Sequence, residues 1–237
     1  MTYGLTQTRT IPYENGSTQI LWERDYTFEV PSIKINNKLF KAIVNSDIKI
    51  DEERVAKVMD NLQNKYYLHP SNKFYEKVIF LPGSNLLCKP DCIDIQRCDK
   101  LIKEGYIIKP HPITAPIFIA ELRARYGKDK VLGKKEGGHE LLLNASEIGT
   151  AQNSEMGITA FLLGKKVQMV SFPVKRRQKR LLTYESFYDA VAGTNAEETI
   201  LKLFSAKNSG IIFNFDEDAD ERLERYLANF WEYEIKL

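Results

Sequence analysis

The sequence contains few cysteine and histidine residues, and this scarcity argues against metal sites built from them. It has three cysteines and three histidines in 237 residues. Cys88, Cys92 and Cys98 lie in one short segment, but their spacing fits no zinc motif and no nearby histidine completes one. Three is an odd number, so we expect free thiols in a reducing compartment and no metal site.

Targeting and membrane segments are also missing. The first ten residues carry no apolar core of a signal peptide, and no stretch approaches the roughly 20 apolar residues that span a bilayer. The sequence has no glycine-rich phosphate loop, no internal repeat and no low-complexity linker. These absences predict a cytoplasmic protein without a membrane span.

The overall composition is that of an ordinary globular protein. Hydrophobic residues make up 43% and charged residues 28%, with a net charge of +2. The charge is clustered, however: residues 175–180 read KRRQKR, and residues 216–224 are strongly acidic. A charge run is most often a solvated face, but the basic run is also a candidate site for a polyanion.

Residues 1–75 are expected to form a smaller, β-rich part. The sequence predicts three strands, with Asn36-Asn37 as a possible hairpin turn before the last of them: Gln19–Trp22, Tyr26–Val30 and Leu39–Val44. A helix capped by Asp51 then continues to about Tyr67.

Residues 76–237 alternate between apolar strands and helices. Short apolar runs at 78–81, 106–109 and 166–172 are separated by helical segments, and a last helix begins near Ala219. This alternation predicts a parallel sheet with right-handed crossovers. The expected fold class is therefore α/β, with a Rossmann-like parallel sheet and flanking helices.

A phosphate site is expected in the stretch from Leu143 to Phe172. A strand is followed by the turn Gln152-Asn153-Ser154-Glu155, by a helix over 156–163 and by Gly164, which suits a left-handed helix end. The free N–H groups of the helix would face the carboxyl edge of the sheet, where phosphates tend to bind. The alternative is that Asn153 and Ser154 only cap the helix.

A second candidate lies at Lys109-Pro110-His111-Pro112, after another predicted strand. The two prolines stiffen the loop and present the imidazole of His111 in a fixed direction. A fixed histidine can donate to a phosphate oxygen and stabilise charge on a departing diphosphate. A purely structural histidine is the alternative.

These residues carry a resemblance to a known family. The order strand, His-Pro loop, serine turn and the helix GITAFLLGKKV (157–167) resembles the nucleotide-sugar domain of GT-B glycosyltransferases. It is most similar to capsule and polysialic-acid-type enzymes, which have a His-Pro motif and a paired-serine motif. The likeness covers residues 78–172, and the short first half implies a reduced GT-B fold with residues 1–75 as a possible acceptor side.

The resemblance implies a set of donor contacts. His111 and Ser154 would bind the nucleotide phosphate, with Asn153 in place of the first serine. Thr159 stands where many such enzymes have a ribose-binding glutamate, so Glu155 is the nearest substitute. Glu147 and Glu155 share the E-x7-E spacing of some retaining enzymes, although chance also explains it. The implied chemistry needs a nucleotide-sugar co-substrate and no metal or other cofactor.

The acceptor side is less defined. A carboxylate would serve as general base, and Asp47, Asp91 and Asp94 are candidates by position. Gly83 and Ser84 follow the first parallel strand and would line the cleft from the other side. The basic run begins just after the strand at 166–172, so it is the candidate acceptor or polyanion site: Lys175, Arg176, Arg177 and Arg180.

The leading hypothesis is a glycosyltransferase that moves a sugar from a nucleotide sugar to an acceptor hydroxyl. The acceptor would be a glycan or, as in phage enzymes that glycosylate hydroxymethylated DNA in the host cytoplasm, a modified base. One alternative is another α/β enzyme that processes nucleotide sugars. The other is a non-catalytic nucleic-acid-binding protein in which the basic run is the functional element.

Overall fold

The computed structural model describes residues 5–13, 16–23, 26–29, 33–66, 74–83, 93–151, 154–172, 185–213 and 216–235. The chain divides into two compact units. The first combines Met1–Asn61 with Ser186–Leu237, and the second is Leu62–Glu185. This division differs from the predicted boundary near residue 75, because the C-terminal segment belongs to the same unit as the N-terminal one.

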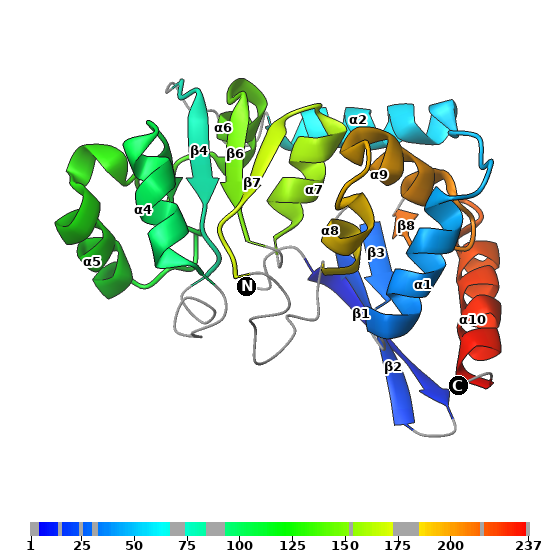
Figure 1. Ribbon diagram of the computed structural model, residues 1–237. Coiled ribbons are helices and arrows are strands. Elements are labelled where there is room, and N and C mark those ends of the chain that lie inside the picture. The colour runs from blue at the N-terminus through cyan, green and yellow to red at the C-terminus, as the bar shows by residue number, and fades with distance from the viewer. Residues whose placement is uncertain are drawn as a thin grey trace. The chain divides into compact units, whose positions relative to one another are not determined.

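The second unit is built on a four-stranded parallel sheet. Its strands are β4 (Lys77–Phe80), β5 (Ile107–Lys109), β6 (Glu147–Thr150) and β7 (Lys166–Met169), in the spatial order β5-β4-β6-β7. All neighbouring pairs are parallel, and Figure 1 shows the arrows of β4, β6 and β7 pointing the same way. The predicted α/β class with a Rossmann-like parallel sheet is therefore confirmed.

Helices cover both faces of this sheet. One core joins α4 (Ile95–Lys103) and α5 (Pro116–Tyr126) to Ile79 and Ile108. The other joins α6 (Gly138–Asn144) and α7 (Glu155–Leu162) to Val78, Phe80 and Ile148. Successive strand residues point to opposite faces. Both faces of these strands are covered, so they read as continuous apolar runs.

Two helix ends near this sheet have clear caps. The helix α4 begins at Ile95, and Asp94 is its N-cap, because the Asp94 side chain accepts a hydrogen bond from Arg97 N at 3.2 Å. Gly164 adopts φ +63° at the end of α7, as its sequence position predicts. Val131 adds only a single parallel bridge beside Ile108.

An ionic cluster joins the amino ends of the parallel strands. Glu147 Oε1 lies 3.1 Å from Lys77 Nζ, and Glu147 Oε2 lies 2.9 Å from Lys166 Nζ. Tyr106 OH also donates to Glu147 Oε2 at 2.8 Å. Hydrogen bonds from Lys166, Tyr106 and Lys77 lower the pKa of Glu147 to about 2. One carboxylate therefore ties together β4, β6, β7 and the residue before β5.

Replacing Glu147 with glutamine is expected to lower the melting temperature at pH 7, because both ion pairs lose their charge. The pKa of Glu147 is lower in the folded chain than the ordinary value of 4.5 that the unfolded chain has. The stabilisation is therefore complete above about pH 4.5 and is lost as the pH falls towards 2. The difference between wild type and Glu147→Gln should shrink over that range. Glu104→Gln, which affects an exposed pair with Lys100, should show no such pH dependence.

The first unit has an antiparallel sheet in the order β1-β2-β3-β8. Its strands are β1 (Leu5–Tyr13), β2 (Gly16–Glu23), β3 (Tyr26–Glu29) and β8 (Ile212–Phe213). Its helices include α1 (Ile33–Val44), α2 (Glu52–Tyr66), α9 (Ala196–Ser205) and α10 (Ala219–Ile235), with α8 (Glu185–Val191) preceding α9. In β8, Ile212 pairs with Thr27 of β3, which explains why the last segment joins the first.

The strand predicted at Leu39–Val44 and the turn at Asn36-Asn37 are wrong, because α1 spans both. Leu39, Phe40 and Ile43 are all buried, at exposed fractions of 2–3%, and this i, i+1, i+4 spacing places them on one helical face. The Phe40 ring packs edge-on against Phe187 at 5.1 Å. Tertiary packing therefore outweighs the local turn signal of the two asparagines.

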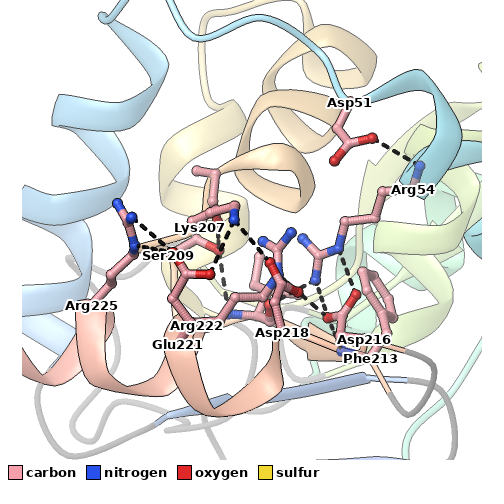
Figure 2. Close-up of polar contacts among 12 residues, drawn as sticks. Asp51, Arg54, Lys207, Ser209, Phe213, Asp216, Asp218, Glu221, Arg222 and Arg225 are labelled. Carbon is pink, nitrogen blue, oxygen red and sulfur yellow. Dashed lines mark hydrogen bonds and ion pairs between the residues drawn. The ribbon is translucent and has the colours of Figure 1, made fainter.

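A buried ionic network connects α2 to the segment before α10 (Figure 2). The Arg54 guanidinium is 5% exposed and forms a two-point contact with the Asp216 carboxylate, with Nε to Oδ1 at 2.9 Å. Arg54 also donates to the carbonyls of Phe204 and Ile211 and lies over the Phe213 ring. Asp216 Oδ2 in turn accepts from Phe213 N at 2.7 Å.

The network continues along α10. Arg222 Nε donates to Asp218 Oδ1 at 2.8 Å, and Lys207 Nζ lies 3.2 Å from both Asp218 and Glu221. Asp216, Asp218 and Glu221, which are three of the six acidic residues in the run 216–224, therefore pair with cations of their own unit. Within the described ranges, no helix is long and apolar enough to cross a bilayer.

Candidate functional site

The strand order of the parallel sheet defines a topological switch point. The chain passes from β4 to β5 on one side and then returns past β4 to β6 on the other side. The connections that follow β4 and β6 therefore leave the carboxyl ends of these strands in opposite directions. Open α/β sheets commonly bind ligands in the crevice between two such connections. The segments at this point are Leu81–Gly83 after β4 and Ala151–Ser154 after β6, of which residues 152 and 153 lie outside the described residues.

The helix α7 begins directly at this edge. Ser154 is its N-cap, and its Oγ accepts a hydrogen bond from Met156 N at 3.3 Å. Ser154 N donates to Ala151 O at 3.1 Å, which fixes the turn at the end of β6. Capping and a ligand contact are compatible, because one capped N–H leaves other donors of the first turn. The predicted position of Ser154 and of this helix start is confirmed, while their binding role stays a prediction.

His111 lies in the loop after β5, at the same edge of the sheet. Its side chain is half-buried, and its Nδ1 accepts a hydrogen bond from Ile113 N at 3.3 Å. An accepting Nδ1 places the proton of a neutral imidazole on Nε2, so Nε2 is the donor atom. Thr114 N also donates to His111 O at 2.9 Å, which closes a tight turn. The loop therefore orients the ring, as the two flanking prolines predict.

The structure brings the two predicted elements to one edge. The strands β5 and β6, which lead to His111 and Ser154, both pair with β4 and are separated by that strand alone. Two inter-strand spacings put the strand ends ~10 Å apart. A single extended ligand lying across the end of β4 would reach both. Gly83, which was predicted to line the same cleft, is buried in the segment that follows β4, the strand between β5 and β6.

Lys109 has a different position from the one expected of a phosphate ligand. Its side chain is 3% exposed, and Nζ donates to Pro110 O at 2.7 Å and to Lys134 O at 3.2 Å. Burial lowers the pKa of Lys109 to about 8. Two of the three ammonium donors are therefore used to join the His-Pro loop to the loop that contains Lys134. This geometry makes Lys109 a positioning residue for the loop.

The depressed pKa of Lys109 predicts a distinct pH dependence. The unfolded chain binds a proton at Lys109 up to about pH 10.5, whereas the folded chain loses it near pH 8. The stability of the wild type should therefore rise, relative to Lys109→Met, between about pH 8 and 10.5. Below pH 8 the variant leaves two buried carbonyls without their donor, so its melting temperature should be lower. Urea unfolding of both proteins across this pH range measures the effect, and parallel curves would contradict it.

Of the three candidate bases, Asp91 lies outside the described residues, and Asp94 and Asp47 have separate positions. Asp94 caps α4, and its N–H donates to Val170 O at 2.7 Å, which places it at the carboxyl edge after β7. Asp47 belongs to the first unit, where it is exposed between α1 and α2. The general-base role of either residue stays a prediction. The side chain of Glu155 is not among those described. The remaining predicted site residues lie outside the described residues: Ser84, Gln152, Asn153, Lys175, Arg176, Arg177 and Arg180.

The E-x7-E pairing of Glu147 with Glu155 is wrong as a shared site. Glu147 is the first residue of β6 and belongs to the ionic cluster at the amino ends of the strands. Glu155 begins the helix at the opposite edge. A strand of four residues rises about 3.3 Å per residue, so these two positions cannot converge. Thr159, at the position where many such enzymes have a ribose-binding glutamate, is 6% exposed. The role of Glu155 as its substitute stays a prediction.

The structure adds residues that the sequence did not single out. A methyl group placed on Gly138 would lie 3.8 Å from both Phe80 and Met156, so the start of α6 adjoins the ends of β4 and the first turn of α7. Glu140 follows in this helix, and its Oε2 is buried with no hydrogen-bond partner among the described residues. Thr114 Oγ1, three residues after His111, is likewise buried without a partner. The local sequence signal for the first is the run Gly137-Gly138-His139-Glu140.

No three acidic, histidine or cysteine side chains gather as a metal site within the part of the chain that the structure describes. The described polar groups at this edge are the imidazole of His111, the helix start and hydroxyl of Ser154, and the carboxylates of Asp94 and Glu140. Donors oriented in this way suit an anionic ligand. The cysteine that the structure describes, Cys98, is buried, and burial raises its pKa to about 12.

The parallel sheet defines the chain as an α/β protein with a Rossmann-like sheet and a topological switch point. No known protein-family model matches the sequence, and no curated protein matches it. Among solved structures, the chain is similar to the wall teichoic acid polymerase TagF soaked with CDPG, with a TM-score of 0.35 and 15% identity. The match covers 83% of this chain and 44% of that one, so the chain spans less than half of its length. This likeness is too loose to transfer a site or a substrate.

Proposed function

We propose that this chain is a glycosyltransferase that uses a nucleotide-sugar donor. The observation that supports this most is the placement of His111 and the α7 start at one carboxyl edge, on either side of the end of β4. A diphosphate lying across the switch point would meet an imidazole donor at one end and helix N–H groups at the other. The sequence resemblance to His-Pro GT-B enzymes favours the same arrangement.

In this proposal the residues have separate roles. The first-turn N–H groups of α7 and the Ser154 hydroxyl bind the nucleotide phosphate. His111 donates from Nε2 to the phosphate oxygen that gains charge as the sugar–phosphate bond breaks. The acceptor is a hydroxyl compound, and its deprotonation requires a carboxylate such as Asp94. These protein donors would neutralise the diphosphate without a metal.

A panel of ligands tests the proposal. Uridine, cytidine, guanosine and adenosine diphosphates, and sugar nucleotides of each, should be compared for their effect on the melting temperature. A ligand that binds only the folded chain raises the melting temperature with its concentration. We expect at least one nucleoside diphosphate to do so, and the shift should be smaller for Ser154→Val. If no member of the panel shifts the melting temperature, the proposed donor site is wrong.

Hydrolysis or transfer must then be measured with the nucleotide sugar that binds. Release of free nucleoside diphosphate would support the enzyme hypothesis over a non-catalytic nucleic-acid-binding protein. A short DNA duplex and a glycan should be supplied as separate acceptors, because the two acceptor classes remain alternatives. Binding of DNA that is unaffected by His111→Ala, without any turnover, would favour the non-catalytic alternative.

A further inference from the structure

A groove of about 580 Å³ runs along one face of α5, apart from the residues at the switch point. It is lined by residues of that helix and of the segment that follows it: Pro116, Ile119, Ala120, Arg123, Ala124, Lys128, Gly133 and Lys134. Neither His111 nor Ser154 belongs to this lining. The volume lies in the range of ligand-binding clefts. The proposed sugar-transfer chemistry makes no use of this groove.

The lining has a definite chemical character. Apart from Arg123 its helix side is aliphatic, and Ala120 and Ala124, four residues apart, leave the helix backbone open to close approach. Three cations surround this surface, Arg123, Lys128 and Lys134, and no carboxylate is among the lining residues. Within the part of the chain that is described, none of the three forms an ion pair. An occupant must therefore combine an aliphatic face with negative charge.

The neighbouring surface extends the apolar area. Ile117, also on α5, is 63% exposed, and Ile113 in the preceding loop is 47% exposed. Pro112 and Pro116 beside them are exposed as well. Single exposed aliphatic residues are common, but contiguous ones beside a charged rim are typical of a protein-binding site.

The geometry favours a helix as the occupant. The lining of α5 from Pro116 to Ala124 extends for ~12 Å, about two helical turns. Because Ala120 and Ala124 are exposed, a lipid chain laid on them would remain half in water, whereas an amphipathic helix keeps its own polar face outward. No aromatic side chain lines the groove, so it offers no stacking platform for the bases of a nucleic acid. We propose that the α5 groove binds an acidic amphipathic helix of a partner protein.

The test uses three synthetic peptides and the full chain. The first is a fluorescein-labelled 14-residue peptide with leucines at i, i+3, i+4 and i+7 and glutamates elsewhere. The second has the same composition in scrambled order, and the third has every glutamate replaced by glutamine. Fluorescence anisotropy should show the first peptide binding at least ten times more tightly than the other two, because only it combines both features.

Variants locate the binding surface. The double variant Lys128→Glu/Lys134→Glu and the single variant Ala124→Glu should each weaken binding of the first peptide tenfold or more. Lys103→Glu, an equal change of charge at an exposed position on α4, is the matched control and should change binding less than twofold. Melting curves of all variants confirm that they are folded.

Several outcomes would overturn the inference. Equal binding of the scrambled peptide would mean a general attraction for negative charge. Equal or tighter binding of a 14-nucleotide single-stranded DNA, or of vesicles of phosphatidylglycerol and phosphatidylcholine, would assign the surface to a nucleic acid or a membrane. Binding that the Ala124→Glu and Lys128→Glu/Lys134→Glu changes do not affect would place the peptide elsewhere. None of these results depends on whether the chain transfers sugar.

Discussion

Replacing Arg54 with methionine is expected to lower the free energy of unfolding of the first unit by about 3–5 kcal/mol, the cost of breaking a buried ion pair. The stability falls because the groups that Arg54 contacts stay buried but lose their hydrogen-bond donor. Asp216 keeps a side chain that is 4% exposed but loses its two-point contact, and the carbonyls of Phe204 and Ile211 lose their shared donor. Methionine fills part of the volume and supplies no hydrogen bond.

The intrinsic fluorescence of the chain makes this loss measurable. Both tryptophans, Trp22 and Trp231, belong to the first unit. Urea unfolding followed by tryptophan fluorescence therefore reports on that unit. Arg225→Met is the matched control, because Arg225 is 57% exposed and its pair with Glu221 lies at the surface. The control should cost less than about 1 kcal/mol.

A double-mutant cycle separates the ion pair from simple loss of packing. In Arg54→Met/Asp216→Asn the buried charge of Asp216 is gone, while the asparagine oxygen can still accept from Phe213 N. The buried Arg222, which lies 3.8 Å from Asp216 in the wild type, keeps its closer ion pair with Asp218. The double variant should be at least about 1 kcal/mol more stable than the sum of the single changes predicts. Additive effects would mean that the Arg54–Asp216 contact of Figure 2 contributes no coupling energy.

The second large effect concerns turnover. If the proposed function holds, His111→Ala should reduce the rate of donor cleavage about 100- to 1000-fold, the usual cost of removing one donor to a developing negative charge. The variant should fold normally, because the side chain is only half-buried and the closing bond of its loop, Thr114 N to His111 O, uses the backbone. Donor affinity should fall much less than the rate.

Two further variants make this result interpretable. His111→Gln retains an N–H donor on a more flexible side chain and should recover part of the rate. Ile113→Ala keeps the N–H that bonds to His111 Nδ1 and should leave the rate within about threefold, because it changes only an exposed side chain. A rate for His111→Ala within threefold of the wild type would remove the imidazole from the mechanism.

Much of the second unit follows from local sequence. Its strands are short apolar runs between turn residues, and its helices carry start and end signals such as Pro116 and Gly164. In a parallel sheet these local patterns also determine the site, because every carboxyl end meets at one edge. This is why the positions of His111 and Ser154 could be predicted without coordinates. The role of Lys109 could not, because its partner Lys134 is 25 residues away.

The first unit was harder to predict for the same reason. Its first strand, Leu5–Tyr13, was missed, and the pairing of β3 with β8 joins Thr27 to Ile212. No periodicity within either segment encodes a contact over such a separation. The burial of Arg54 could not be predicted for a similar reason. A charged residue on a helix is expected at the surface, and only the position of Asp216, far away in the sequence, explains why Arg54 is buried.

The discontinuity of the first unit has a consequence for biosynthesis. A ribosome releases β3 long before it makes β8, and the whole parallel-sheet unit emerges between them. The inserted unit can therefore fold while the antiparallel sheet still has an open edge at β3, which is a template for pairing with other chains. Translation speed through the last 50 residues would then govern how long that edge stays open to aggregation.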